Sequence, residues 1–356
     1  MKKEIRIGNK IIGEGYPCFI IAEAGVNHNG KLSLAKKLVD AAKSSGADAV
    51  KFQTFKADLI VSKYAKKAQY QRRATDANES QLDMLKKLEL SVNDHKELIK
   101  YCKARRIIFL SSPFDINSIN LLDSLGLETF KVPSGEINNI PYLMELGYLN
   151  KKVIISSGMA TLTEVREALR VLVSSGTKKD NIVVLHCTSA YPADFKDVNL
   201  RAMCTIKNVL KVKVGYSDHT SGIEVSIAAV AIGALVIEKH LTLNKKMPGP
   251  DHKASLEPDE FKKMVSAIRN IGMALGTGLK APAIIEESIM KLMRKSIVAK
   301  VDIPKGSRIT GSMVDTRRPG TGIEPKYLKN LIGRVASKRI SENQVISWGH
   351  IKRGNG

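Results

Sequence analysis

Short, nearly continuous apolar runs alternate over most of the chain with longer segments whose apolar residues recur at helical spacing. Such runs are typical of parallel strands buried on both faces of a sheet, and the segments between them are typical of amphipathic helices. Eight runs are predicted as strands: near residues 18–25 and 47–55, and onward from Ile107, Glu128, Lys152, Asn181, Val212 and Ala234.

Signals for helix ends lie between these runs. The segment KLSLAKKLVDAAKSSG ends on Gly46, which suits a helix C-terminus, and TLTEVREALRVLVSSG begins with the capping-box pattern Thr161-x-x-Glu164. Eight strands, each followed by a helix, predict an α/β protein with a (β/α)₈ TIM barrel; an open, doubly wound sheet is the alternative. The first strand is not followed by a GxGxxG motif, which favours the barrel.

The pattern changes after Ala281. The segment KSIVAKVDIPKGSRITGSMVDTRRPGTGIEP alternates short strand-like runs with Pro-Lys-Gly and Pro-Gly turns, so it predicts a small all-β domain. The expected organisation is a barrel over 1–281, a linker over 282–294 and the β domain over 295–356. A domain of about 60 residues has a marginal core, so we expect it to dock on another surface.

The composition is ordinary for a soluble globular protein. The chain has 356 residues, 43% of them hydrophobic and 26% charged. No apolar run approaches the roughly 20 residues of a membrane span, and the start MKKEIRIGNKII lacks the apolar core of a secretory signal. The four cysteines are widely spaced, with no CxxC pair, so we expect them to be reduced. A cytoplasmic location without a membrane is the expectation.

The net charge of +22 allows two interpretations. Clustered lysines and arginines with interleaved aromatic residues would indicate nucleic-acid binding. Here the basic residues are spread along the predicted helices without that interleaving, so a nucleic-acid partner is not expected. The charge is compatible with steering of an anionic small molecule.

Two histidines end neighbouring predicted strands. His219 follows the seventh strand and His240 ends the eighth, and the carboxyl ends of barrel strands are where active sites lie. Two imidazoles there can reach one divalent cation, with water or substrate oxygens completing its shell. The alternative is a pair of separate structural histidines. Asp218 should face away from the site, because side chains alternate along a strand.

Lysines and hydroxyl groups follow the other strands. Lys51 and Lys131, with serines at several strand ends, predict a cradle for a phosphate and a carboxylate. A single serine could be a helix N-cap, but the whole set is not explained that way. Glu23 and Glu136 are candidate acid–base groups or partners of the lysines. A strand-end lysine would also fit a Schiff-base aldolase, but the histidine pair favours a metal-assisted reaction of a phosphate ester.

Several motifs together resemble the sialic acid synthase family. They are IAEAGVNHNG, AVKFQTFKAD, FKVPSGE, SSGMAT, LHCTSAYP, GYSDHTSG, IEKHLT and PGPDHKASLEPDE, and the tail RKSIVAKVDIPKGSRIT with RRPGTGI resembles that family's antifreeze-like (SAF) domain. The resemblance implies condensation of phosphoenolpyruvate with N-acetylmannosamine, or a related N-acetylated amino sugar, and water. The products would be an N-acetylneuraminate-type acid and phosphate. Legionaminate and pseudaminate synthases, which use diacetamido-trideoxy hexoses, are close variants.

The resemblance also implies roles for individual residues. His219 and His240 would bind Mn²⁺, or Mg²⁺ or Co²⁺ in its place, and Glu23 would stabilise the positive charge that develops at the former enol carbon. Phosphoenolpyruvate would be bound by Lys51, Ser112, Lys131, Ser134, Ser156, Ser189 and Ser217. Ser189 stands where some family members have Asn. The sugar would be bound by Gln53, Glu136, Tyr191, Asp251 and Arg318. The family's equivalent of Arg318 reaches the partner's sugar, which implies a domain-swapped homodimer.

Overall fold

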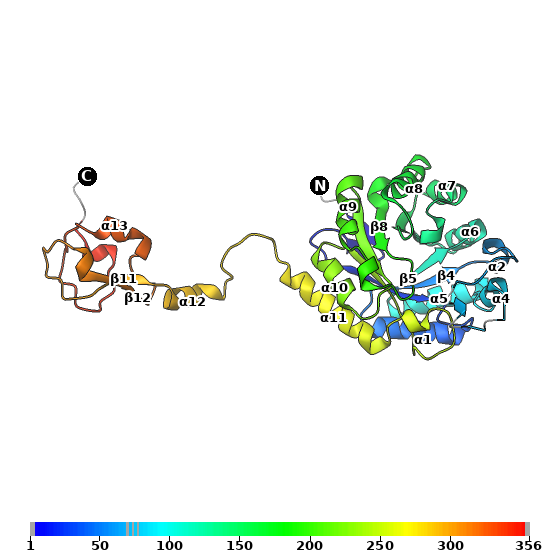
Figure 1. Cartoon of the computed structure of the whole chain (residues 1–356), viewed down its shortest axis with the longest axis horizontal. Helices are drawn as coiled ribbons and strands as arrows, with labels where there is room; N and C mark the ends of the chain where they lie inside the picture. The colour runs from blue at the N-terminus through cyan, green and yellow to red at the C-terminus, as the bar shows by residue number, and fades with distance from the viewer. Residues whose placement is uncertain (1–3, 69–70, 73–74, 77, 353–356) are drawn as a thin grey trace. The chain divides into compact units, whose positions relative to one another are not determined.

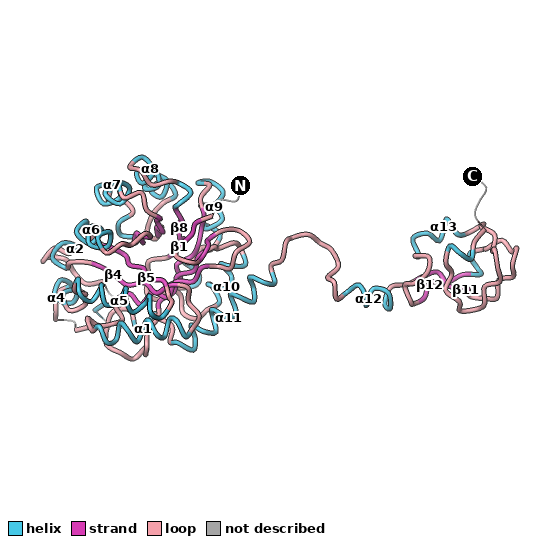
Figure 2. The backbone as a smooth tube through the Cα atoms, turned by 180° about the vertical axis from the view of Figure 1, so that it is seen from behind, coloured by secondary structure: helices cyan, strands magenta, loops and turns pink. Residues whose placement is uncertain are grey.

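A computed structural model describes residues 4–68, 71–72, 75–76 and 78–352 of the chain. It divides into two compact units, 1–276 and 277–356 (Figures 1 and 2). Within the described residues, none of the helices combines the length and apolar character needed to cross a bilayer.

The first unit is built on eight parallel strands. In chain order they are β3 (Phe19–Gly25), β4 (Ala49–Thr54), β5 (Ile108–Pro113), β6 (Thr129–Val132), β7 (Lys152–Ser156), β8 (Ile182–Cys187), β9 (Lys213–Asp218) and β10 (Val236–His240). The hydrogen-bonded order is β5-β4-β3-β10-β9-β8-β7-β6, and the end strands β5 and β6 also lie side by side. The predicted TIM barrel is therefore confirmed.

Helices cover the outside of this sheet (Figure 1). They are α1 (Leu32–Ser44), α5 (Val92–Arg105), α6 (Ile116–Ser124), α7 (Ile140–Tyr148), α8 (Leu162–Ser174), α9 (Arg201–Leu210), α10 (Glu224–Ala231) and α11 (Pro258–Ala274), with the short α2 (Ala57–Ile60) and α4 (Gln81–Lys86) before α5. The predicted capping box is present at α8, where Thr161 and Glu164 each accept from the other's backbone N–H. Gly46 follows α1 with φ +85°, a conformation that suits glycine at a helix end.

A hairpin that the sequence pattern did not predict precedes the barrel. Its strands β1 (Ile5–Ile7) and β2 (Lys10–Ile12) pair antiparallel. Ile5, Ile7 and Ile12 are buried against apolar side chains from the beginnings of the barrel strands, among them Ile21 and Ala49. The hairpin therefore closes the N-terminal end of the barrel, and the carboxyl ends of the strands are left to form a site.

The second unit is a small domain with its own core. It contains α12 (Glu286–Met293), β11 (Ser296–Ala299), β12 (Val314–Arg317) and α13 (Leu328–Leu331). Its buried side chains are mainly isoleucines: Ile297, Ile303, Ile309, Ile323, Ile340, Ile346 and Ile351. Besides the β11–β12 ladder, the backbone pairs through isolated bridges, such as that between Ile303 and Ile340. The structure thus has the predicted small β domain, with its own core and antiparallel pairing. The segment expected as a linker contains α12, and the Lys291 carbonyl there accepts from Gly320 N at 2.8 Å.

Candidate active site

A pocket of about 290 Å³ lies at the carboxyl ends of the barrel strands. Every strand of the barrel, or the loop directly after it, contributes to its lining. The sequence-predicted residues that line it are Glu23, Lys51, Gln53, Ser112, Lys131, Ser134, Ser156, Ser189, Tyr191, Ser217, His219 and His240. Pairs two positions apart, such as Ser217 and His219, point the same way because strand side chains alternate.

Lys51 is the centre of a buried network on one side of the pocket. Its Nζ lies 2.8 Å from Glu23 Oε2 and 3.4 Å from Glu238 Oε2. It also donates a hydrogen bond to Ser112 Oγ at 2.9 Å. Burial alone would lower the pKa of Lys51, but the two carboxylates outweigh burial and raise it. Lys51 is therefore a fixed, protonated cation.

Glu238 is the site residue to which sequence analysis assigned no role. Its Oε1 lies 3.2 Å from Lys131 Nζ and accepts a hydrogen bond from Ser217 Oγ at 2.8 Å. Burial alone would raise the pKa of Glu238, but the Lys131 and Lys51 ammonium groups hold it well below its ordinary value. Glu238 is therefore an anion that bridges the two lysines. Its position at the end of β10, two residues before His240, was the only sequence signal for this role.

The Glu23 carboxyl has a different protonation behaviour. Burial raises the pKa of Glu23 to about 7; nearby Lys51 lowers it and Glu238 raises it. The side chain is almost fully buried, with 2% of its residue surface exposed. A carboxyl whose pKa lies near neutral pH can both hold and release a proton under working conditions.

His219 and His240 lie together at the rim, with ring centroids 5.6 Å apart. His219 Nδ1 lies 2.7 Å from the Thr188 carbonyl, so Nδ1–H donates to it and Nε2, 3.4 Å from Ser217 Oγ, carries the ring's lone pair. His240 Nδ1 is buried and has no hydrogen-bond partner among the described residues. Burial lowers the pKa of both imidazoles, and His219 lowers that of His240 further.

These two neutral imidazoles fit a divalent cation. A fixed tautomer and a partnerless ring nitrogen are the features that a ligand histidine needs. Across the described ranges of the chain, no group of three or more His, Cys, Asp or Glu side chains could hold a metal ion. Water or substrate oxygens would therefore have to complete the coordination shell.

Hydroxyl groups line the opposite side of the pocket. Ser134 Oγ accepts from Gly158 N at 3.1 Å, and Ser156 Oγ is buried without a hydrogen-bond partner in the described part of the chain. A Cβ at Gly158 would overlap Ser189 Oγ and would lie 2.7 Å from Ser134 Oγ. Glycine at this position therefore leaves room for the hydroxyls of Ser134 and Ser189, which together with that of Ser156 can donate to an anion.

Three of the predicted sugar-binding residues lie near Glu23 and the histidines. Gln53 Nε2 donates to Glu23 Oε1 at 3.5 Å, and the Tyr191 ring centroid lies 4.3 Å from that of His219. Asp251 is buried but is not among the lining residues; its Oδ2 lies 3.7 Å from where a Cβ of Gly25 would stand. Burial raises the pKa of Asp251 to about 6.

The other two predicted sugar-binding residues lie elsewhere. Glu136 ends a short 3₁₀ turn after β6, outside the pocket lining, and accepts from Asn139 Nδ2 at 2.6 Å. Arg318 belongs to the second unit, where its Nε donates to the Met293 carbonyl at 3.1 Å.

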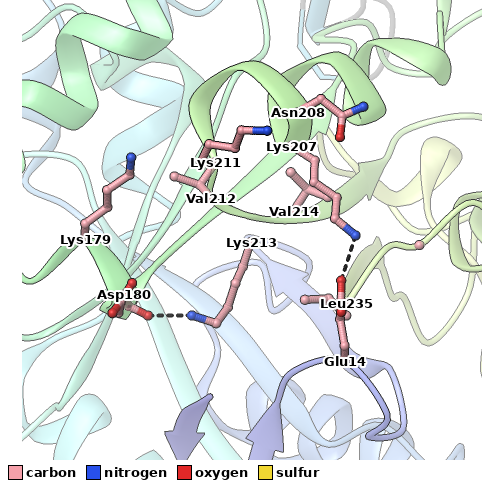
Figure 3. Close-up of a pocket in the computed structure, with 11 residues that line it drawn as sticks. Glu14, Lys179, Asp180, Lys207, Asn208, Lys211, Val212, Lys213, Val214 and Leu235 are labelled. Carbon is pink, nitrogen blue, oxygen red and sulfur yellow. Dashed lines mark hydrogen bonds and ion pairs between the residues drawn. The ribbon is translucent and has the colours of Figure 1, made fainter. Parts of the chain in front are cut away.

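Figure 3 shows a different pocket, of about 320 Å³, near the beginnings of β9 and β10. Its lining is rich in lysines, but Lys207 Nζ lies 2.9 Å from Glu14 Oε1 and Lys213 Nζ donates to the Asp180 carbonyl at 2.7 Å. None of the sequence-predicted site residues is among its lining residues. The candidate active site is therefore the pocket at the carboxyl ends of the strands.

Comparisons with known proteins agree with both units. The NeuB family model matches residues 38–280, and the SAF domain model matches residues 294–352. The N,N'-diacetyllegionaminic acid synthase of Campylobacter jejuni is 54% identical over 92% of this chain and 98% of that protein. The protein of the same name from Legionella pneumophila is 48% identical over 97% and 98%. A crystal structure of N-acetylneuraminic acid synthetase from Leptospira borgpetersenii, in complex with citrate, is 34% identical, covers 82% of this chain and 96% of that chain, and has a TM-score of 0.72.

Proposed function

Because the chain belongs to the NeuB family, we propose that it is a nonulosonic acid synthase that condenses phosphoenolpyruvate with an N-acetylated amino sugar and water, releasing phosphate. The observation that carries the proposal is the composition of the strand-end pocket. It combines two buried lysines, a row of available hydroxyls and two neutral histidines. Phosphoenolpyruvate has two anionic groups and the sugar has a carbonyl oxygen, and the pocket offers partners for both.

We propose a diacetamido-trideoxy hexose as the acceptor, with legionaminate as the type of product. The motifs alone led us to expect N-acetylmannosamine first. Both relatives described above are named for N,N'-diacetyllegionaminic acid, and both are more similar to this chain than the Leptospira protein. The similarity to the Leptospira N-acetylneuraminic acid synthetase is the observation that favours N-acetylmannosamine as the second candidate.

The anion-binding roles follow from the buried charges. We assign Lys51 and Lys131 to the phosphate and carboxylate of phosphoenolpyruvate, with hydrogen bonds from Ser112, Ser134, Ser156, Ser189 and Ser217. Because Lys51 is held protonated by two carboxylates, it is a poor amine nucleophile. This counts against Lys51 as the nucleophile of a Schiff-base aldolase, whereas burial lowers the pKa of Lys131, so the borohydride test below has to decide for that residue.

We assign Glu23 to the carbon that becomes the ketone. With a pKa of about 7, it can accept a proton from an attacking water and can offset positive charge at the former enol carbon. We assign Gln53, Tyr191, Asp251 and Glu136 to the sugar. His219 and His240 would hold Mn²⁺, or Mg²⁺ or Co²⁺, which acts when bound as a Lewis acid toward the sugar aldehyde.

Phosphate release tests the reaction directly. We expect release from phosphoenolpyruvate to depend on a 2,4-diacetamido-trideoxy mannose-type sugar more than on N-acetylmannosamine, to stop with EDTA and to return with Mn²⁺. His219→Ala and His240→Ala should each abolish it. Release that persists in EDTA, together with a borohydride-trapped adduct on Lys51 or Lys131, would instead establish the aldolase.

We also propose that Arg318 acts on the active site of a second copy, in a domain-swapped homodimer. Arg318→Ala and His240→Ala would then be inactive alone, but mixed and reassembled dimers would contain one complete site. We expect the mixture to recover about a quarter of wild-type activity, since half of the dimers are mixed and each has one active site. A mixture without recovery, from variants shown to exchange subunits, would contradict the swap.

A further inference from the structure

Asp218 and Lys239 directly precede His219 and His240, and they are paired residues in the register of β9 and β10. Alternation along each strand turns their side chains away from the pocket that the histidines line. Both residues have 0% exposure, and Lys239 Nζ lies 2.9 Å from Asp218 Oδ2. A fully buried ion pair therefore joins the two strands immediately behind the histidines.

The pair also fixes the backbone after His219. Asp218 Oδ1 accepts from both the N–H of Thr220, at 2.9 Å, and its hydroxyl, at 2.7 Å. Lys239 Nζ donates to the Thr220 carbonyl at 2.6 Å. Both sides of one residue are thus held by the ion pair. The remaining Asp218 oxygen accepts from Ser226 Oγ of α10 at 2.7 Å, which ties the strands to the helix that covers them.

Stability alone does not explain such a pair. A buried ion pair costs desolvation that its mutual attraction only partly repays, and well-packed apolar residues are often as stable or more so. Directional hydrogen bonds, in contrast, define one arrangement of the atoms that they join. The arrangement defined here is the relative position of two strand ends that carry the two histidines.

We propose that the Asp218–Lys239 pair is a positioning device that holds His219 and His240 in the one relative geometry that binds a divalent cation. The inference rests on the proposed function, because that function places the cation on these histidines. Neither residue touches the reacting atoms; both act through the backbone. Loss of either partner should weaken cation binding without removing a ligand.

The test measures Mn²⁺ affinity from the electron paramagnetic resonance signal of free Mn²⁺, without substrates. We expect Asp218→Asn and Lys239→Met to raise the dissociation constant by about tenfold, the lower end of the effect of losing a group that hydrogen-bonds a metal ligand directly, because this pair acts through the backbone. At saturating Mn²⁺ the variants should regain phosphate release with the wild-type KM for phosphoenolpyruvate.

Asp48→Asn is the matched control. Asp48 is also a buried carboxylate, 2.7 Å from Arg269 Nη2, and its Oδ2 accepts from Ile20 N at 2.9 Å. It precedes β4 and so lies at the other end of the barrel. Asp48→Asn should cost stability but leave Mn²⁺ affinity unchanged. Equal weakening of Mn²⁺ binding by both substitutions would overturn the inference.

The milder Ser226→Ala decides the matter if Asp218→Asn does not fold. It removes one hydrogen bond to Asp218, and it should weaken Mn²⁺ binding measurably. Wild-type affinity in Ser226→Ala, or in a folded Asp218→Asn, would overturn the positioning role while leaving the proposed function standing. A wild-type protein that does not bind Mn²⁺ would overturn both.

Discussion

At the residue scale, Glu238 controls the charge of the active site. It is an anion between Lys51 and Lys131, and it also raises the pKa of Glu23. In Glu238→Gln the repulsion between the Glu238 and Glu23 carboxylates is lost. Glu23 is then the only one of these two carboxylates that pairs with Lys51. Both changes favour ionised Glu23, so its pKa should fall below about 7.

The pH–rate profile of phosphate release checks this expectation. If ionised Glu23 is the working form, the acidic limb of kcat/KM should move to lower pH in Glu238→Gln. Ser217→Ala is the control, because it removes a hydrogen bond to Glu238 but keeps the charge. Ser217→Ala should reduce the rate of phosphate release but leave the acidic limb of the profile close to its wild-type position. An acidic limb that Glu238→Gln leaves in place would refute the role assigned to Glu238.

Gly158 determines whether the hydroxyl side of the pocket can form. In Gly158→Ala the new Cβ would overlap Ser189 Oγ and press on Ser134 Oγ, 2.7 Å away. We expect the KM for phosphoenolpyruvate to rise roughly tenfold, with about 1–3 kcal/mol lost from the free energy of unfolding. Gly135→Ala is a matched control from the same pocket, because its Cβ would meet nothing within 4 Å. Equal effects of the two substitutions would contradict the steric explanation.

At the element scale, the N-terminal hairpin stabilises the end of the barrel opposite the site. Ile12 is fully buried in the cluster that the hairpin shares with the strand beginnings, whereas Ile11 is half-buried. Ile12→Ala should lower the free energy of unfolding by about 2–5 kcal/mol, and Ile11→Ala by clearly less. Urea unfolding measures both. Similar losses for the two would mean that the hairpin does not seal the barrel.

The eight barrel strands could be predicted because each is a continuous apolar run, and their boundaries are close to those observed. The run near 18–25 is β3 (Phe19–Gly25), and that near 47–55 is β4 (Ala49–Thr54). The hairpin was missed because its strands have three residues each, too few to show a period. Because consecutive strands are neighbours in a barrel, this prediction also placed the polar residues at the carboxyl ends of the strands close together.

What the sequence could not supply was distance within the site. Glu238 was visible as a strand-end residue, but its bridge between Lys51 and Lys131 depends on how close three strands approach. Glu136 lies outside the pocket lining because a 3₁₀ turn follows β6, where the pattern suggested only a strand end. The position of a residue along its strand predicts whether its side chain points toward the site. The conformation of the loop that follows the strand determines whether a residue in that loop lines the pocket.

At the scale of the whole molecule, the histidines share one property. The sequence has seven, and all have a pKa lowered by burial. The unfolded chain therefore binds protons more readily than the folded one as the pH falls below about 6.5. The buried carboxyls Glu23 and Asp251, whose pKa values are raised, act in the opposite direction. A comparison of variants isolates the histidine contribution.

His28 is the sharpest test. It is fully buried, its Nδ1 accepts from Gly30 N at 3.0 Å, and burial lowers its pKa to about 4. Its contribution to stability is complete above pH 6.5 and is lost as the pH falls to about 4. His28→Asn keeps an acceptor near Nδ1 but does not titrate. Urea unfolding at pH 7 and at pH 4 gives the free energy of unfolding under both conditions. Between pH 7 and pH 4 the wild type should lose about 3 kcal/mol more of this free energy than the variant. Equal losses of unfolding free energy in the two proteins would mean that protonation of His28 does not destabilise the folded state.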